Sequence, residues 1–199
     1  MINYYFITQP KRDNEMARTN APTPEEARQI EAVLRRRNVT FADAWALNLN
    51  LALRISDLLA LTYDDVAGNV VTIKEKKTGK LKVFPINNRA REIISRRRAA
   101  YPEDVFLFQS KSNRVKNHPP KAITRESASR AFSEAGEMVT DKNISSHSAR
   151  KCRGRALWET GTPIETISKM LNHSSPAVTM TYLDITQDEV NQTYYELNI

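Results

Sequence analysis

The sequence predicts one mainly helical domain with a small antiparallel β-sheet. The chain has 199 residues, which suits a single domain with a sizeable core. Apolar residues recur at helical spacing through most of it, whereas only residues 70–73 and 81–86 are typical of β-strands. Residues 1–21 lack a clear period, so we expect them to form a tail and residues 22–199 to form the domain.

Two helices are predicted in the first part of the chain. Residues 23–26 have the form of a capping box with proline at the first helical position, and their helix should end at Arg37. Thr40 is then expected to cap a strongly apolar helix with Trp45 in the core. Arg54 follows the end of this helix among apolar residues. A buried arginine needs a strong anionic partner, which makes Arg54 a candidate site residue.

The two predicted strands are joined by residues 74–80, which form a basic hairpin tip. Five lysines lie within residues 74–82. This density favours contact with phosphate over the alternative, a charged loop that only faces solvent.

Helical periodicity continues after the hairpin. Residues 89–100 predict an amphipathic helix whose three arginines, residues 96–98, face outward, and residues 124–139 predict another helix. Residues 148–159 predict a further helix. Residues 162–165 again have the form of a capping box, with proline at the first helical position.

A last short helix is predicted to start at Ser175 and to carry Tyr182 on its final turn. His147, His173 and Tyr182 therefore fall at helix boundaries, where side chains can converge on one cleft. Together with Arg150 they suit a phosphodiester. The rigid fork of an arginine matches phosphate oxygens, histidine can donate hydrogen bonds or move protons near neutral pH, and tyrosine can act as a covalent nucleophile.

The spacing of these residues resembles the C-terminal signature of the tyrosine recombinase (phage integrase) family: H-x-x-R, then L-x-H, then a tyrosine nine residues later. Residues 52–59 are similar to the family's segment around an earlier arginine, with Ala52 for the usual glycine and Asp57 for glutamate. The resemblance covers roughly residues 22–190. It implies the fold of the family's catalytic domain, a DNA breaking-rejoining enzyme.

The resemblance implies a site-specific recombinase or integrase that works through a 3'-phosphotyrosyl intermediate. Tyr182 would be the nucleophile, and Arg54 and Arg150 would hold the phosphate oxygens. His173 would donate a further hydrogen bond, and His147 would accept or position the tyrosine proton. No metal or cofactor is expected, because arginine and lysine carry the electrostatic load.

The family also places a catalytic lysine on a hairpin beside the scissile phosphate. Lys77, within Lys-Thr-Gly, is the best match in this chain. Lys76 and Lys80 are the alternates for this role and are also candidates for DNA contact.

Three further residues are candidates for supporting roles. Asp57 lies three residues after Arg54 and is expected to hold Arg54 or His147 in place. In the family, the helix ahead of the H-x-x-R motif approaches the DNA major groove. Ser127 and Arg130 are therefore candidates for DNA contact.

The charge balance suits a polyanionic partner, since 30 Lys and Arg residues outnumber 23 Asp and Glu, for a formal net charge of +7 and a pI near 9.6. The resemblance implies double-stranded DNA with specific recombination sites, bound by a chain that is a monomer in isolation and a tetramer on paired sites. The single cysteine, Cys152, and the lack of a membrane span or signal peptide pattern predict a cytoplasmic location, near the nucleoid of a bacterial or phage-infected cell. The spacing of Cys152, His147 and His173 matches no usual zinc site.

Two other functions stay open from the sequence. Residues 148–171 could form the helix-turn-helix of a DNA-binding regulator, which would not need Tyr182. A type IB topoisomerase carries almost the same catalytic set and would relax supercoils without pairing two sites. Taken singly, His147, His173 and Tyr182 also fit structural roles at helix ends or in a core.

The ends of the chain carry two further expectations. Family members usually have a DNA-clamping domain before the catalytic one. The chain shows no such domain, so the resemblance implies a fragment or a small member like the fimbrial-switch recombinases, with weak DNA binding by this chain alone. Residues 183–199 could form a helical face that packs within the chain or docks on a neighbouring protomer.

Overall fold

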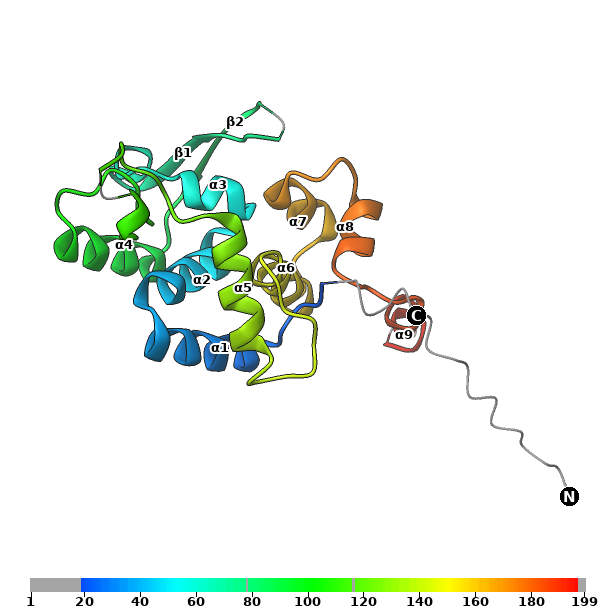
Figure 1. Cartoon of the computed structure of the whole chain (residues 1–199). Helices are drawn as coiled ribbons and strands as arrows, with labels where there is room; N and C mark the ends of the chain where they lie inside the picture. Colours follow the sequence, from blue (N-terminus) through cyan, green and yellow to red (C-terminus); the bar gives the residue numbers. More distant parts are fainter. Residues whose placement is uncertain (1–18, 78, 116, 197–199) are drawn as a thin grey trace, which may run out of the picture.

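Helix α2 (Val39–Leu51) lies at the centre of the computed structural model, which describes residues 19–77, 79–115 and 117–196. The helices that pack most extensively against α2 are α1 (Pro24–Arg37), α4 (Asn88–Ala100), α5 (Arg125–Gly136) and α6 (Ser148–Glu159) (Figure 1). A helix that is apolar around most of its circumference is typically enclosed by others in this way. Trp45 of α2 is fully buried and meets the Phe132 ring edge-on, with 5.1 Å between the ring centroids.

The remaining elements are shorter, and most of them lie at the periphery of this bundle. They are α3 (Ile55–Ala60), the 3-10 turns η1 (Asp64–Val66) and η2 (Asn113–Val115), the strands β1 (Val70–Lys74) and β2 (Leu81–Pro85), α7 (Ile164–Leu171), α8 (Pro176–Tyr182) and α9 (Gln187–Glu196). The predicted fold class, mainly helical with a small antiparallel sheet, is confirmed. Within the described part of the chain, no helix is both long and apolar enough to cross a membrane.

The predicted start was right for α1 and wrong for α2. Thr23 caps α1, and its side chain and that of Glu26 bind each other's backbone N–H groups as the capping box requires. Helix α2 is capped by Asn38, not by Thr40. The Asn38 side chain accepts from the Thr40 N–H at 2.9 Å, because the extended Asn38 backbone both ends α1 and starts α2.

The bounds predicted for α6, residues 148–159, were right, but the cap predicted for α7 was wrong. Helix α7 begins after Pro163 and has no side-chain cap. The Thr162 N–H donates to the Leu157 carbonyl at 2.9 Å, so Thr162 belongs to the turn that closes α6 and not to the start of α7.

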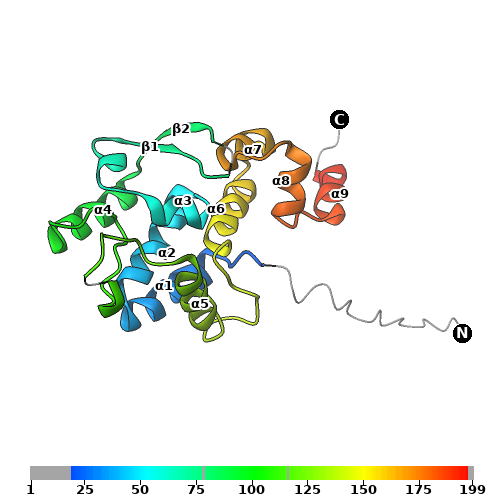
Figure 2. The same cartoon turned by 45° about the horizontal axis from the view of Figure 1, so that its top comes forward.

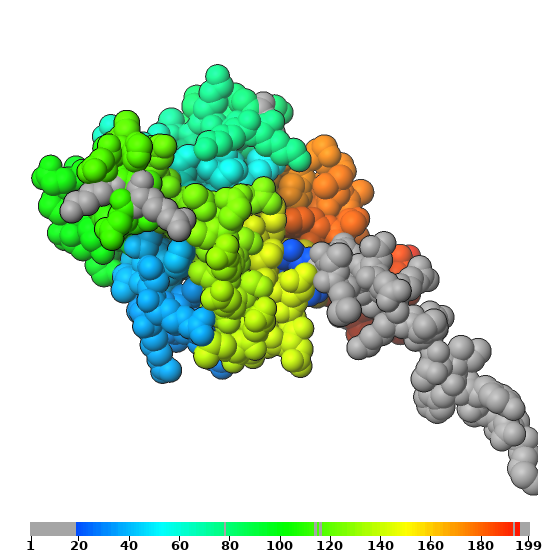
Figure 3. All heavy atoms as spheres, viewed as in Figure 1, coloured from blue at the N-terminus to red at the C-terminus, as the bar shows by residue number. Residues whose placement is uncertain are grey.

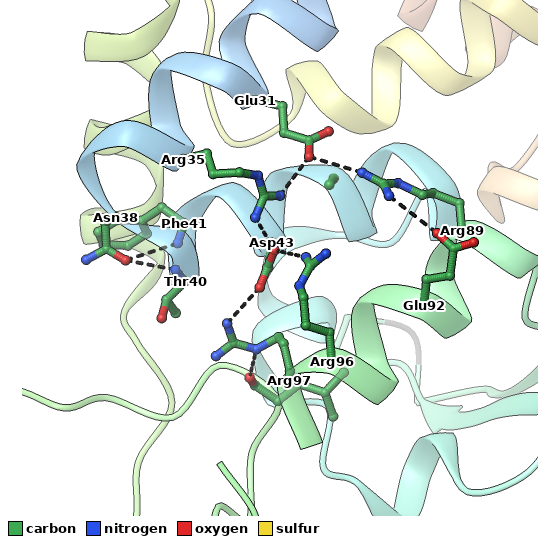
Figure 4. A network of polar contacts seen from close by, with 12 residues as sticks. Glu31, Arg35, Asn38, Thr40, Phe41, Asp43, Arg89, Glu92, Arg96 and Arg97 are labelled. Carbon is green, nitrogen blue, oxygen red and sulfur yellow. Dashed lines mark hydrogen bonds and ion pairs between the residues drawn. The ribbon is translucent and has the colours of Figure 1, made fainter. Parts of the chain in front are cut away.

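Arg97 on α4 was expected to face solvent and is instead buried, with its side chain 2% exposed. Its Nη1 donates to Asp43 Oδ2 at 3.1 Å and its Nε donates to the Leu107 carbonyl at 2.6 Å (Figure 4). Asp43, on α2, also accepts from Arg35 of α1 and Arg96 of α4. One buried carboxylate therefore joins three helices.

The β1–β2 hairpin pairs antiparallel, with Thr72 opposite Val83. Val71 and Ile73 are buried in the core, whereas β2 leaves Val83 exposed. The hairpin runs toward α7 (Figure 2), where the Lys82 ammonium donates to the Met170 carbonyl at 2.7 Å. The hairpin is thereby attached to the C-terminal part of the chain.

A second, smaller core lies beneath α7 and α8. Its buried members are Ala52, Ile167, Leu171 and Leu183. Gly154 on α6 permits close packing here, because a Cβ atom at this position would lie 2.7 Å from Leu183 Cδ2. Helix α8 therefore rests on a core that is distinct from the one around α2.

Residues 1–18 of the predicted tail lie outside the described residues. Asn20 is bound to the body, because its N–H donates to the Asn143 carbonyl at 2.9 Å and its side chain accepts from the Asn143 N–H at 3.0 Å. At the other end, Tyr194 and Tyr195 of α9 are exposed. Residues 197–199 of the expected C-terminal face lie outside the described residues.

Candidate active site

Arg54 lies between α2 and α3, and its side chain is mostly buried. Ala52 caps the C-terminus of α2 with φ +50°, a left-handed conformation that usually favours glycine. The backbone is then extended at Arg54, just before α3. Arg54 Nη1 lies 3.0 Å from Glu75 Oε2, and Arg54 Nη2 donates to the Asn172 carbonyl at 3.4 Å. The guanidinium is therefore held between the hairpin and the end of α7.

Arg150, on the first turn of α6, is buried and binds the ends of two other helices. Its Nη1 donates to the Ala52 carbonyl and its Nη2 donates to the Leu171 carbonyl. Carbonyls at helix C-termini lack intrahelical partners, so they are natural acceptors for a buried guanidinium. Burial lowers the pKa of Arg150 below its ordinary value. Because Leu171 and Asn172 are consecutive, Arg150 and Arg54 bind neighbouring carbonyls and lie close together.

His173 follows α7 and contacts α8. Its Nδ1 lies 3.0 Å from Thr179 Oγ1, and its ring meets the Tyr182 ring edge-on, with 4.8 Å between centroids. Burial lowers the pKa of His173 to about 4, and the charges of Arg150 and Arg54 act in the same direction. The imidazole is therefore neutral near pH 7 and can donate one hydrogen bond.

Tyr182 and His147 line one hollow of about 410 Å³. The Tyr182 hydroxyl is buried, and the Arg150 guanidinium lies next to it. Burial raises the pKa of Tyr182, while the charge of Arg150 opposes that rise. Burial lowers the pKa of His147, and Arg125 adds to this effect. The site thus offers a protonated phenol and a neutral imidazole in one hollow.

The hairpin brings Lys77 within electrostatic reach of these groups. The Lys77 side chain is exposed, yet its charge contributes to the lowered pKa of both His147 and His173. Lys76 and Lys80 are exposed on the same hairpin. All three predicted lysines therefore lie on one basic hairpin tip near the site.

Lys82 is a site neighbour that the sequence did not single out. It lies on β2, and burial lowers its pKa, with the charge of Arg150 as the next cause. Its ammonium donates to the Met170 carbonyl, so it also satisfies one of the last carbonyls of α7. The only signal in the sequence was the density of lysines along the hairpin.

The carboxylate that contacts Arg54 is Glu75, not Asp57. We expected Asp57 to hold Arg54 or His147, but its Oδ1 accepts from the Lys76 N–H at 3.1 Å and so fastens the hairpin. The Glu75 side chain is only 1% exposed and forms the ion pair with Arg54. Sequence reasoning missed Glu75, because it stands in a run of charged residues that otherwise face solvent.

Helix α5 places the two predicted DNA contacts in different settings. The Ser127 hydroxyl donates to the Thr124 carbonyl at 2.8 Å, within the cap of the helix. Arg130 is exposed. Arg125, at the first position of α5, was not predicted, yet its charge is the largest cause after burial of the lowered pKa of His147. Arg125 therefore lies close enough to the site for its charge to act on His147.

The elements that carry these residues adjoin on one face of the molecule. In the space-filling view, the hairpin, α3, α5 and the α7–α8 region meet there (Figure 3). The five motif residues come together although they are far apart in the sequence; they are Arg54, His147, Arg150, His173 and Tyr182. His147 and Tyr182 line the hollow, and His173, Arg150 and Arg54 lie near Tyr182. Two guanidiniums, two neutral imidazoles and a phenol grouped in this way can bind phosphate oxygens and present a nucleophile to phosphorus.

Comparison with protein families identifies this constellation. Residues 22–189 match the model of the phage integrase family. The chain belongs to the phage integrase family. It is therefore a site-specific tyrosine recombinase, an enzyme that cuts and rejoins DNA. Family membership decides against the helix-turn-helix regulator and the type IB topoisomerase.

The integrase-family chain has two named bacterial relatives. It is 29% identical over 171 residues to the "Probable integrase/recombinase YoeC" of Bacillus subtilis (strain 168), a match that covers 85% of this chain and 91% of that protein. It is 23% identical over 189 residues to the "Tyrosine recombinase XerD" of Chlamydia pneumoniae, covering 86% of this chain and 60% of XerD.

Solved structures of recombinases share the fold. The XerA recombinase superposes with a TM-score of 0.72 at 16% identity, covering 96% of the integrase-family chain and 68% of XerA. A lambda integrase dimer bound to a COC' core site gives a TM-score of 0.70 at 15% identity, covering 92% of this chain and 51% of that one. These likenesses support the same helical architecture with its small sheet.

Proposed function

We propose that Tyr182 cleaves DNA by attacking the scissile phosphorus. Its hydroxyl oxygen forms a bond to phosphorus, the bond from phosphorus to the 5' oxygen breaks, and a 3'-phosphotyrosyl linkage results. His147 takes the phenolic proton, and Lys77 donates a proton to the leaving 5' oxygen. Attack by a second 5'-hydroxyl reverses these steps, since the linkage keeps the energy of the original phosphodiester.

Arg54 and Arg150 bind the non-bridging oxygens and oppose the charge that grows on them in the transition state. His173 donates a third hydrogen bond. Its contact with Thr179 fits this role, because a proton on one ring nitrogen is directed by the partner of the other. Lys76, Lys80, Ser127 and Arg130 remain proposed contacts to the DNA duplex.

One observation carries the proposal. The Tyr182 hydroxyl is buried next to Arg150, the Tyr182 ring meets the His173 ring edge-on, and Tyr182 shares a hollow with His147. A buried phenol usually finds a hydrogen-bond partner. Here the neighbouring polar group is the Arg150 guanidinium, a candidate for phosphate binding, so the phenol and the anion-binding group lie side by side.

We further propose the setting in which this chemistry occurs. Residues 22–199 act as the catalytic domain on double-stranded DNA with specific sites, as a monomer in isolation and as a tetramer on paired sites. The basic charge supports DNA as the partner. We propose that the enzyme acts on cellular DNA in the cytoplasm, at the nucleoid of a bacterial or phage-infected cell.

The test is capture of the covalent intermediate. The protein is incubated with a pool of nicked duplexes that carry a random central segment, and complexes that resist detergent are isolated. The nick lets the short strand with the 5'-hydroxyl leave, so cleavage cannot reverse. We expect the wild type to form adducts whose DNA shares a sequence motif, and Tyr182→Phe to form none.

An adduct that persists in Tyr182→Phe would remove Tyr182 from its proposed role. Trapped DNA without a common motif would contradict the specific sites. Thermal melting of both proteins serves as the control, because loss of a single hydroxyl should leave the fold intact.

A further inference from the structure

Glu75 occupies an unusual position for a carboxylate on a basic hairpin. Its side chain is 1% exposed, although its neighbours Lys74, Lys76 and Lys77 are exposed. Its Oε2 accepts from the Asn172 side-chain amide and pairs with Arg54 at 3.0 Å. Glu75 therefore reaches from the hairpin into the floor of the active site.

Asn172 contributes the other half of this contact. It ends α7 with φ +48°, where glycine is the least strained residue and asparagine is the next most tolerated. Its carbonyl accepts from Arg54, its side chain donates to Glu75, and the next residue is His173. A glycine would be enough for the backbone conformation of this turn. The asparagine side chain adds the hydrogen bond to Glu75, which the turn itself does not require.

The contact lies at the root of the hairpin tip. The Glu75 N–H donates to the Lys80 carbonyl at 3.0 Å, and the Gly79 N–H donates to the Glu75 carbonyl at 2.8 Å. Lys77 stands two residues beyond Glu75 within this turn. Fixing the Glu75 side chain therefore fixes the base of the short loop that carries Lys77.

We propose that Glu75 and Asn172 are positioning residues that hold the Lys77 loop over the phosphate-binding side chains. The inference rests on the proposed role of Lys77 as proton donor to the leaving oxygen. An exposed lysine side chain has many rotamers, and a proton donor must lie within hydrogen-bond reach of its acceptor. The buried Glu75–Asn172 bond joins the loop to the element that carries His173.

The test compares two substrates of the same sequence, taken from the captured DNA. One has the ordinary 5' oxygen at the scissile position, and the other has a bridging 5' sulfur. A thiolate leaves without a proton, so the second substrate does not need Lys77. Single-turnover cleavage is measured for Asn172→Gly, which keeps the turn, and for Asn172→Asp, which places a second negative charge beside Glu75.

We expect Asn172→Gly to slow cleavage of the oxygen substrate about tenfold, because only part of the rate enhancement from a positioned general acid is lost. Asn172→Asp should slow this cleavage further. Both should cleave the sulfur substrate within about twofold of the wild type, as Lys77→Ala should, if only proton donation is lost. The double variant Glu75→Gln/Asn172→Asp exchanges the amide and the carboxylate and should recover most of the lost rate. Glu92→Gln, an exposed change on α4, should match the wild type on both substrates.

Equal slowing on both substrates would overturn the proposal, because a merely structural role affects both alike. Wild-type rates in the Asn172 variants, or no recovery in the double variant, would overturn it as well. If the wild type itself forms no adduct that depends on Tyr182, the proposed function fails, and that result is distinct from these.

Discussion

His173 links the site to pH at the scale of a single residue. Its pKa is about 4 in the folded protein, against 6.5 for an unperturbed histidine. Between these two values the unfolded chain binds more protons than the folded one. Stability contributed by neutral His173 is therefore fully present above pH 6.5 and is lost as the pH falls through about 4.

We predict that His173 titrates near pH 4 in the protein without DNA, and that Lys77→Met moves the midpoint upward. The loss of a nearby positive charge makes protonation of the imidazole easier. The measurement is the NMR shift of the histidine ring signals against pH, with Arg28→Met on α1 as the matched control. A midpoint near 6.5, or no movement in Lys77→Met, would show that the burial and charge argument is wrong.

Individual site residues could be predicted where they belong to a motif with a recognisable spacing. His147, Arg150, His173 and Tyr182 stand in a recognisable order, so the sequence singled them out as candidates. Glu75 stands in no such pattern, because its role depends on a contact with Asn172 that is 97 residues away. Pairings over that separation are set by the packing of the elements, which local patterns do not encode.

At the scale of elements, Asp43 holds α1, α2 and α4 together. The carboxylate is 1% exposed and pairs with Arg35, Arg96 and Arg97 (Figure 4). Arg97 is nearly as buried as Asp43 and lies over the Phe108 ring, with 5.0 Å from the guanidinium carbon to the ring centroid. Removing the negative charge would leave that guanidinium buried without its ion-pair partner.

We predict that Asp43→Asn lowers the free energy of unfolding by about 3 kcal/mol, the low end for breaking a buried ion pair from one side. Urea unfolding followed by circular dichroism measures the change. The matched control is Asp64→Asn in η1, where the side chain is exposed and the change should stay within about 0.5 kcal/mol. A similar small change in Asp43→Asn would mean that the network contributes little to stability.

Helix positions were more predictable than helix caps and helix faces. The bounds of α6 followed from periodicity, whereas Asn38 and not Thr40 caps α2. Either side chain can cap, and the choice was decided by the sharp junction with α1. Arg97 was misplaced because the arginine triplet looks uniform, and only Asp43 on another helix distinguishes the middle one.

At the scale of the whole molecule, the net charge of +7 predicts salt-dependent binding to any duplex. We predict that Lys76→Gln reduces the slope of log affinity against log salt by about 1, as expected for one lost phosphate contact. Fluorescence anisotropy with a random-sequence duplex measures this slope. Arg28→Gln is the control, because α1 lies at the opposite end of the molecule from the hairpin (Figure 1), and the slope should not change. Equal slopes for wild type and Lys76→Gln would remove Lys76 from the DNA surface.

The two separate cores have a consequence for the order in which the molecule opens. The core beneath α7 and α8 has few buried side chains, while the core around α2 spans most of the bundle. A region with a small apolar core forms a local cooperative unit that detaches at lower free energy than the whole domain. If Tyr182 becomes joined to a DNA strand, as we propose, the segment that carries it can therefore move with that strand while the helical bundle keeps its packing. Amide hydrogens of α8 should accordingly exchange with solvent before those of α2.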